Sequence, residues 1–199
     1  MPYPVSVAVE PQVEHRNRLT VAFRLILAIP HLILVGPIAG AYRAGSAGLL
    51  GAVAYFLAII NWFAIVFTGE AIPAIRDFAL YYLRWRTRAM AYEAILVDPY
   101  PPFGDGPYPA SIDVPEPPKP RDRLTVAFRL ILIIPHAFVL FFLLIGWCVT
   151  SVIAWFAILF TGSYPAGVMP FGLGVMRWTL RVEAYMLLLV DEYPPFAIE

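Results

Sequence analysis

Arg18-Leu-Thr-Val-Ala-Phe-Arg-Leu-Ile-Leu-Ala-Ile-Pro-His31 decides the fold, because this stretch returns at residues 123–136 with one substitution, Ala28 to Ile133. A second stretch, Trp62-Phe-Ala-Ile-Val-Phe-Thr-Gly69, returns in the same order at 155–162. Self-similarity of this kind indicates an internal duplication. The fold is therefore one unit of about half the chain, used twice.

The duplication divides the chain into a first repeat, residues 1–103, and a second repeat, residues 108–199, with a joint at 104–107. Matching residues are 105 positions apart in the first part of each repeat and 93 positions apart later, so the first repeat carries 12 extra residues. These fall at about 36–47, where Gly, Pro and Ser predict a loop. Further matched pairs are Arg84 with Arg177, Trp85 with Trp178, Arg88 with Arg181, Tyr92 with Tyr185, Asp98 with Asp191, and Tyr100-Pro-Pro-Phe103 with 193–196.

The composition is typical of a membrane protein. Of the 199 residues, 60% are hydrophobic and 14% are charged, and the mean hydropathy is +0.72, whereas soluble domains are about half apolar and about a quarter charged. The formal net charge of zero provides no overall field that would attract nucleic acid, so no such partner is expected. The single cysteine, Cys148, excludes an internal disulfide and a multi-thiolate metal site.

The motifs RLTVAFRLILxIPH, WFAIxFTG, RW and YPPF together resemble a bacterial membrane family known only as domain of unknown function 4389, here in two tandem copies. The resemblance covers nearly the whole chain. It implies an integral protein of the bacterial plasma membrane. It implies no activity, and no functional residue is carried over from it.

Apolar stretches long enough to cross a membrane occur in both repeats, since a spanning helix needs about 20 such residues. The first repeat has Leu19–Val35 and Leu49–Phe67 on either side of the inserted residues. The second has one unbroken run, Leu124–Phe160, which allows two interpretations. Either it forms a tight helical hairpin that turns near Phe142–Trp147, or its first part lies at the interface and only His136–Phe160 spans.

Basic residues favour the hairpin. Arg16 and Arg18 precede the first apolar run, Arg121 and Arg123 precede the second, and only Arg43, in the insertion, flanks the other end. Lys and Arg near helix ends accumulate on the cytoplasmic side, and a hairpin keeps these clusters on one side. We therefore predict an all-α integral membrane fold with four transmembrane helices and both termini cytoplasmic. The two hairpin repeats would be parallel, related by a pseudo-twofold axis along the membrane normal.

A further helix is expected after each hairpin, at about 71–97 and 168–190, with an aromatic face beside arginines spaced four residues apart. These arginines are Arg84 and Arg88, and Arg177 and Arg181. The pattern is typical of an amphipathic helix at the headgroup boundary, with guanidinium groups on lipid phosphates. The alternative is that the aromatic face packs on the hairpin and the arginines are solvated. Tyr3–Val9 and Ser111–Val114 predict short strands or extended arms on the cytoplasmic side.

Arg24 and Arg129 lie within the apolar runs, six positions after Arg18 and Arg123, where a charge is costly unless it is paired or reaches the headgroups. One interpretation is that they reach headgroups or pair with a carboxylate such as Asp98 or Asp191. The other is a repeated site for an anion or a lipid phosphate, to which the arginine pairs of the following helices contribute.

His31 and His136 each follow a proline inside an apolar run. One interpretation is that the imidazole helps to satisfy the backbone carbonyl that the proline leaves free. The alternative is that the two histidines together bind a haem iron or a metal ion, or have a protonatable or quinone-facing role. Because no carboxylates support them, we expect neither a cofactor nor a metal.

Catalytic motifs are missing from the sequence. There is no glycine-rich nucleotide loop and no GxSxG, and the apolar runs contain no Asp or Glu. We therefore expect no enzyme. Three functions stay open: an accessory or scaffolding subunit of a plasma-membrane complex with an unidentified membrane-protein partner, a binding module for lipid headgroups or other anionic amphiphiles, and a redox or transport role centred on the two repeat histidines.

Overall fold

The computed structural model describes residues 3–38, 47–117 and 119–198, so most of the inserted segment, including Arg43, lies outside the described residues. The fold is mostly helical, with one two-stranded sheet. In chain order the elements are β1 (Ser6–Val9), α1 (Arg18–Ala22), α2 (Arg24–Val35), α3 (Gly48–Thr68), α4 (Pro73–Glu93), β2 (Ala110–Asp113), α5 (Arg123–Ala127), α6 (Arg129–Leu132), α7 (Ile134–Thr161) and α8 (Met169–Met186).

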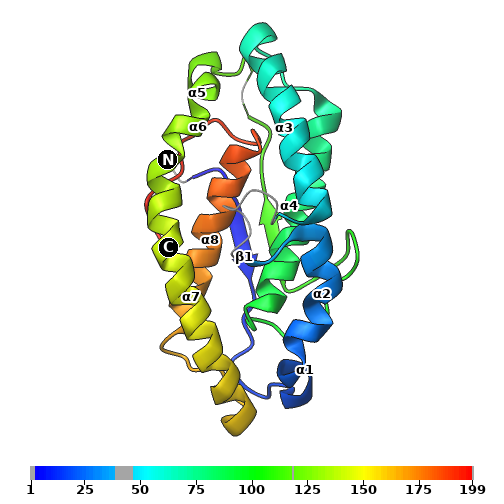
Figure 1. The fold of residues 1–199 in the computed structure, drawn as a ribbon, viewed down its shortest axis with the longest axis vertical. Coiled ribbons are helices and arrows are strands. Elements are labelled where there is room, and N and C mark those ends of the chain that lie inside the picture. The colour runs from blue at the N-terminus through cyan, green and yellow to red at the C-terminus, as the bar shows by residue number, and fades with distance from the viewer. Residues whose placement is uncertain (1–2, 39–46, 118, 199) are drawn as a thin grey trace.

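Helices α1, α2 and α3 follow one another along one edge of the molecule, and α5, α6 and α7 follow one another along the opposite edge (Figure 1). We call these series the first rod (α1–α3) and the second rod (α5–α7). The rods run in opposite directions, as the colour gradients in Figure 1 show. The start of α3 lies against the end of α2, since a Cβ on Gly48 would clash with the backbone nitrogen of Gly36. The first rod therefore resumes its course after the insertion instead of turning back.

The structure corrects the predicted hairpins. In the second repeat, residues 134–161 form one continuous helix, with no turn near Phe142–Trp147. The reason is that the sequence between Ala137 and Thr161 contains one glycine and no proline, so nothing ends α7 until Gly162 adopts a left-handed φ of 79°. Among the described residues, two stretches rather than four are long and apolar enough to cross a membrane, within 48–68 and 129–161.

Each rod begins at a capping side chain and is interrupted at matching positions. The side chains of Asn17 and Asp122 accept hydrogen bonds from the first backbone N–H groups of α1 and α5. The helix then breaks at Phe23 and Phe128, whose φ and ψ lie outside the α-helical region. The break lets the next residue, an arginine in both repeats, point inward, where it is buried.

Helices α4 and α8 form a middle layer. Helix α4 contacts α2, α3 and β2, helix α8 contacts α7 and β1, and the two helices contact each other. Both are buried along most of their C-terminal two thirds. The structure therefore favours packed helices, between the rods and the sheet, over helices that lie free at the headgroup boundary.

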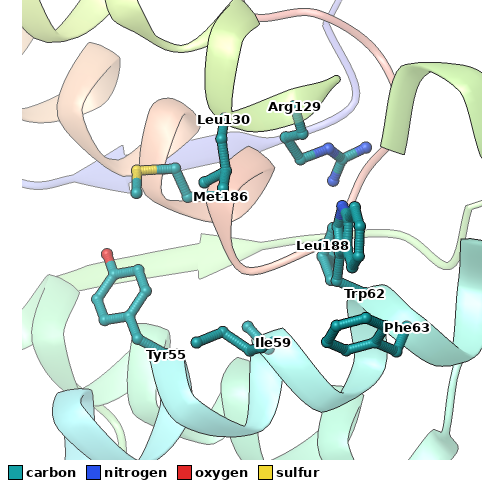
Figure 2. Close-up of a pocket in the computed structure, with 9 residues that line it drawn as sticks. Tyr55, Ile59, Trp62, Phe63, Arg129, Leu130, Met186 and Leu188 are labelled. Atoms are coloured by element: carbon teal, nitrogen blue, oxygen red, sulfur yellow. The ribbon is translucent and has the colours of Figure 1, made fainter. Parts of the chain in front are cut away.

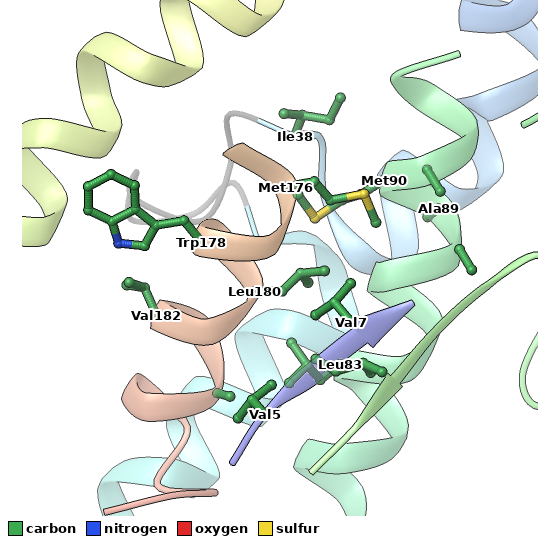
Figure 3. Close-up of a cluster of buried hydrophobic side chains, with 14 of the residues drawn as sticks. Val5, Val7, Ile38, Leu83, Ala89, Met90, Met176, Trp178, Leu180 and Val182 are labelled. Atoms are coloured by element: carbon green, nitrogen blue, oxygen red, sulfur yellow. The ribbon is translucent and has the colours of Figure 1, made fainter. Parts of the chain in front are cut away.

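Strands β1 and β2, one from each repeat, pair antiparallel and confirm the predicted extended segments. Val7 pairs with Ile112, its own counterpart at the offset of 105, so the pseudo-twofold axis passes between these two residues, perpendicular to the rods. In Figure 3, Val5 and Val7 lie against the cluster that α4 and α8 build around Leu83 and Leu180. The core thus lies where the two repeats meet.

Candidate functional site

Arg24 pairs with a carboxylate of its own repeat, as one interpretation of the sequence predicted. Its Nη2 lies 2.9 Å from Oδ1 of Asp98, and Nη2 of Arg16 lies 2.6 Å from the same oxygen. The backbone N–H of Asn17 donates to Oδ2 over 2.8 Å. Burial raises the pKa of Asp98, but these hydrogen bonds and the two guanidinium charges outweigh it and hold the pKa below its ordinary value. Asp98 is therefore ionised at neutral pH.

The second repeat contains the same charge cluster of two arginines around one aspartate. Nη2 of Arg129 lies 3.1 Å from Oδ1 of Asp191, and Nη2 of Arg121 lies 2.6 Å from it. In each repeat, two guanidinium groups meet one carboxylate, which leaves one positive charge in excess. Arg24 and Arg129 are only 1% and 2% exposed, and the Nε of each has no hydrogen-bond partner among the described residues. The excess charge is thus buried. Among the described residues, Nε of Arg24 has no acceptor in the first cluster, and Nε of Arg129 and Nη1 of Arg121 have none in the second.

An aromatic ring covers each of these arginines. The guanidinium carbon of Arg24 lies 4.0 Å from the ring centre of Tyr92, and that of Arg129 lies 4.1 Å from the ring centre of Tyr185. A cation over a ring face is stabilised by roughly 0.5–2 kcal/mol, more when it is desolvated. The repeated tyrosines therefore help to hold the buried charge in place.

His31 lies inside an aromatic box built by its own repeat. Nε1 of Trp85 donates to Nδ1 of His31 over 2.9 Å, and the imidazole stacks on Phe103, with 4.7 Å between ring centres, beside Tyr100. An indole N–H can only donate, so Nδ1 of His31 carries no proton. The ring is neutral, and its Nδ1 is bonded to the tryptophan rather than to the backbone.

His136 has the same surroundings in the second repeat. Trp178 donates to its Nδ1 over 3.0 Å, and Phe196 stacks on it at 4.0 Å beside Tyr193. Each histidine thus lies in the box of its own repeat, and the structure does not bring the two to one shared site. Within the part of the chain that the structure describes, no three His, Cys, Asp or Glu residues are grouped to hold a metal ion.

The arginine pairs of α4 and α8 lie elsewhere. Arg88 donates to two carbonyl groups of the joint and lies 3.2 Å from Asp105. Arg177 donates to a carbonyl of β1, and Arg181 lies over an aromatic ring of the N-terminal segment. Arg84 is exposed. The structure therefore groups these four residues with the sheet and the joint, and separates them from the arginines at the start of α2 and α6.

A groove of about 400 Å³ lies between the two rods (Figure 2). Arg129 and Leu130 of the second rod form one wall, α3 of the first rod forms the other, and Met186 and Leu188 lie between them. The lining residues of α3 are Tyr55, Ala58, Ile59, Trp62 and Phe63. The surface of the groove is almost wholly apolar, and the charged group that it reaches is Arg129.

The pseudo-twofold axis generates a second groove of about 260 Å³ on the other side. Its lining residues are Arg24, Leu25, Glu93, Ile95, Ser151, Val152, Trp155 and Phe156. Each of them is the counterpart of a residue in the first groove, but Glu93 replaces Met186. Burial raises the pKa of Glu93 to about 7, against the lowering effects of a hydrogen bond from the Ile38 N–H and of the Arg86 charge. The second groove therefore contains a carboxyl group that the first groove lacks.

The floor of each groove holds a residue with an unusual backbone. Ile95 and Leu188 both have a φ of 61°, in the left-handed region that branched side chains rarely adopt. Each residue lies just after the end of its helix, at a position of the helix-ending turn that is usually a glycine. In the turn that contains Ile95, the N–H of Leu96 donates to the carbonyl of Ala91, five residues back. The strain costs roughly 1–2 kcal/mol. A glycine at either position would leave the floor open.

Both grooves depend on contacts between the repeats. Nε1 of Trp62 donates to the carbonyl of Val126 over 2.8 Å, and Nε1 of Trp155 donates to that of Val21 over 2.9 Å. Sequence reasoning did not find the grooves, because their walls come from different repeats. One signal in the sequence was available for these contacts. The tryptophan recurs at the same position in both repeats, although the sequence alone predicted no role for it.

The fold defines a class: a helical protein with an internal duplication, an exposed apolar surface on two antiparallel rods and, in the described parts of the chain, two helices of membrane-spanning length. Residues 43–104 and 123–197 match the family described as "Domain of unknown function (DUF4389)". The chain belongs to this family, and the two matched segments are consistent with a tandem duplication of its domain. No curated protein and no solved structure matches the chain.

Proposed function

We propose that this protein is a binding module for anionic amphiphiles, such as phosphate-bearing lipids, embedded in the bacterial plasma membrane. The observation that carries the proposal is an apolar groove that ends at a buried cluster with one excess positive charge. The groove and the cluster occur twice, at Arg24 and at Arg129. A molecule with an apolar chain and an anionic end complements both parts of such a site.

The chemistry of the arginines supports an anion at this position. Nη1 and Nη2 of Arg129 are used by the carbonyl of Tyr185 and by Asp191, which fixes the plane of the guanidinium group. Its Nε has no partner among the described residues. A phosphate oxygen at the end of the groove would supply the missing acceptor, in a charge-assisted hydrogen bond worth roughly 1.5–3 kcal/mol.

The exposed apolar residues at the rim of the first groove favour a ligand that enters from the membrane. Ile59 and Leu130 stand on opposite sides of the first groove and are 58% and 71% exposed. Both belong to the apolar surface of the rods. A lipid that diffuses in the bilayer would meet the groove directly, without first entering water.

The two grooves are expected to bind with different strength. No acidic residue lines the groove that reaches Arg129. The groove that reaches Arg24 is lined by Glu93, whose carboxyl group becomes negative above its pKa of about 7. Ionisation of Glu93 opposes the positive charge of the cluster that contains Arg24. The first groove is therefore the stronger site for an anion.

The experiment compares the lipids that co-purify with four variants, by mass spectrometry. Arg24→Gln/Arg129→Gln removes the charge that faces each groove and is expected to lower the content of anionic lipid several-fold. Ile59→Trp/Val152→Trp fills the grooves from their exposed rims and is expected to act in the same direction. Arg84→Gln and Arg177→Gln remove charges near the sheet and serve as controls. An anionic lipid content that is unchanged in both groove variants would contradict the proposal.

The other functions expected from the sequence stay predictions. A scaffolding role in a membrane complex would be tested by a pull-down in mild detergent. A redox role for the histidines has less support, since Trp85 and Trp178 occupy Nδ1 of both rings. The multi-pass arrangement with cytoplasmic termini also stays a prediction.

A further inference from the structure

We infer that the protein lies flat in one leaflet of a lipid bilayer, with both rods parallel to the membrane plane and the two-stranded sheet in water. The inference rests on the membrane association proposed above. It does not depend on whether the grooves bind a ligand.

The length of the apolar surface is the first argument. Leu124 and Phe160 lie at opposite ends of the second rod and are 69% and 78% exposed. At 1.5 Å per residue, the 36 positions between them correspond to about 54 Å, whereas the hydrocarbon core of a bilayer is about 30 Å thick, or about 40–45 Å with the headgroups. An upright rod would leave apolar side chains in water. A flat rod buries all of them at similar depth.

Within the described parts of both rods, exposed apolar residues recur from one end to the other without a polar interval. In the first rod they are Leu19, Phe23, Leu25, Ile26, Leu27, Ile29, Ile33, Leu49, Val53, Phe56, Ile59, Ile60, Phe63 and Phe67. In the second rod they are Leu124, Phe128, Leu130, Ile131, Leu132, Ile134, Phe138, Phe141, Phe142, Ile145, Val149, Val152, Ile153, Phe156 and Phe160. Because the rods run along the long dimension of the molecule (Figure 1), the exposed apolar residues are spread over that dimension too.

The basic residues at the rod ends are the second argument. Arg18 begins the first rod, and its guanidinium group lies beside Gly162, at the end of the second rod. Arg123 begins the second rod and lies beside Gly69, at the end of the first. Upright rods would place one of these basic ends on each side of the membrane, which the accumulation of Lys and Arg on the cytoplasmic side disfavours. Flat rods place both ends on the same side.

The layers of the fold are the third argument. Helices α4 and α8 contact both the rods and the sheet, so they form a layer between the rods and the sheet. The exposed charges Asp105, Asp113, Glu116 and Lys119 belong to the sheet and the joining segments. One face is therefore polar and the other apolar, as a single leaflet requires. The pseudo-twofold axis then lies along the membrane normal, and the grooves open toward the acyl chains.

Labelling of single cysteines tests the orientation. In a Cys148→Ser background, Glu70→Cys and Ser163→Cys mark the ends of the first and second rods, and Ser111→Cys marks the sheet. A membrane-impermeant maleimide is applied to sealed vesicles of one orientation. The flat arrangement predicts that all three positions react from the same side. Reaction of Glu70→Cys and Ser163→Cys from opposite sides would overturn it in favour of spanning rods.

Depth measurements provide an independent readout. Spin labels at Phe142→Cys and Phe160→Cys, 18 positions and five helical turns apart, lie on the same face of α7. The flat arrangement predicts nearly equal depths in phosphatidylglycerol-containing vesicles. A difference approaching 27 Å, the length of five turns, would contradict it. Recovery of the wild-type chain as a water-soluble dimer that buries the apolar face would also overturn the inference.

Discussion

Arg86 of α4 and Glu183 of α8 form an ion pair with 2.7 Å between Nε and Oε2, and neither side chain is exposed. The two residues are not counterparts, since Arg86 matches Thr179 and Glu183 matches Met90. The same guanidinium group also donates to the carbonyl of Val35 at the end of α2. The pair therefore breaks the symmetry of the duplication and holds the two repeats together at the centre of the molecule.

Glu183→Met is expected to lower the free energy of unfolding by about 3–5 kcal/mol, because it leaves the Arg86 charge buried without its partner. The double variant Arg86→Met/Glu183→Met is expected to recover part of this loss, since no unpaired charge remains. Equilibrium unfolding in detergent, arranged as a double-mutant cycle, measures both values. A loss below about 1 kcal/mol for Glu183→Met would show that the pair does not hold the repeats together.

Glu93 is expected to make stability depend on pH. Burial raises its pKa from 4.5 to about 7, so between these values the folded chain keeps a proton that the unfolded chain has released. Stability therefore falls as the pH rises through this window. Thermal unfolding at several pH values should show a smaller decline for Glu93→Gln than for the wild type. Glu183, whose pKa burial also raises, leaves a residual slope, but identical slopes for the two proteins would rule out the assigned role of Glu93.

The bond between Trp85 and His31 predicts a single tautomer. Nitrogen NMR of the wild type should show Nδ1 of His31 without a proton and the proton on Nε2. Trp85→Phe is expected to lose this preference and about 1 kcal/mol of stability. Trp178→Phe is the matched variant and should affect His136 in the same way. A protonated Nδ1 in the wild-type protein would be incompatible with the hydrogen bond.

The left-handed conformation of Ile95 predicts an unusual order of stabilities. Ile95→Ala removes the buried side chain and keeps the strain, whereas Ile95→Gly removes both. Glycine should therefore be more stable than alanine at this position by about 1 kcal/mol, the reverse of their order within a helix. Leu188→Gly and Leu188→Ala repeat the comparison in the first groove. Unfolding free energies that rank alanine above glycine at both positions would contradict the strained floor.

The sequence was sufficient for the parts of the fold that depend on the duplication. It predicted the repeats and the two short extended segments, and it offered the pairing of Arg24 with a carboxylate such as Asp98 as one of two interpretations, because each follows from residues within one repeat. It was not sufficient for the course of the rods. Hydrophobicity shows that a helix resumes after an insertion but not in which direction, so the loop at 36–47 was interpreted as the turn of a hairpin.

The unbroken apolar run in the second repeat predicted the course of its rod better than the loop in the first repeat did. After Pro135 this run contains one glycine and no further proline, so no residue predicts a helix end before Gly162, and the structure has 134–161 as one helix. The grooves were not predicted for the same reason, because the direction of the rods was interpreted wrongly. Their walls join α3 to α6 and α7 to α2, so they become visible only when the two rods are known to run antiparallel.

The most direct test of the proposed function is native mass spectrometry of the delipidated protein with phosphatidylglycerol, an anionic lipid, and with zwitterionic phosphatidylcholine. The wild type should bind two molecules of the anionic lipid, the first more tightly than the second, and should bind phosphatidylcholine more weakly. Arg129→Gln should weaken the tighter site by about tenfold, or about 1.4 kcal/mol, while Arg84→Gln should leave it unchanged. Equal affinity for the two lipids, or a tight site that Arg129→Gln does not alter, would contradict the proposed function.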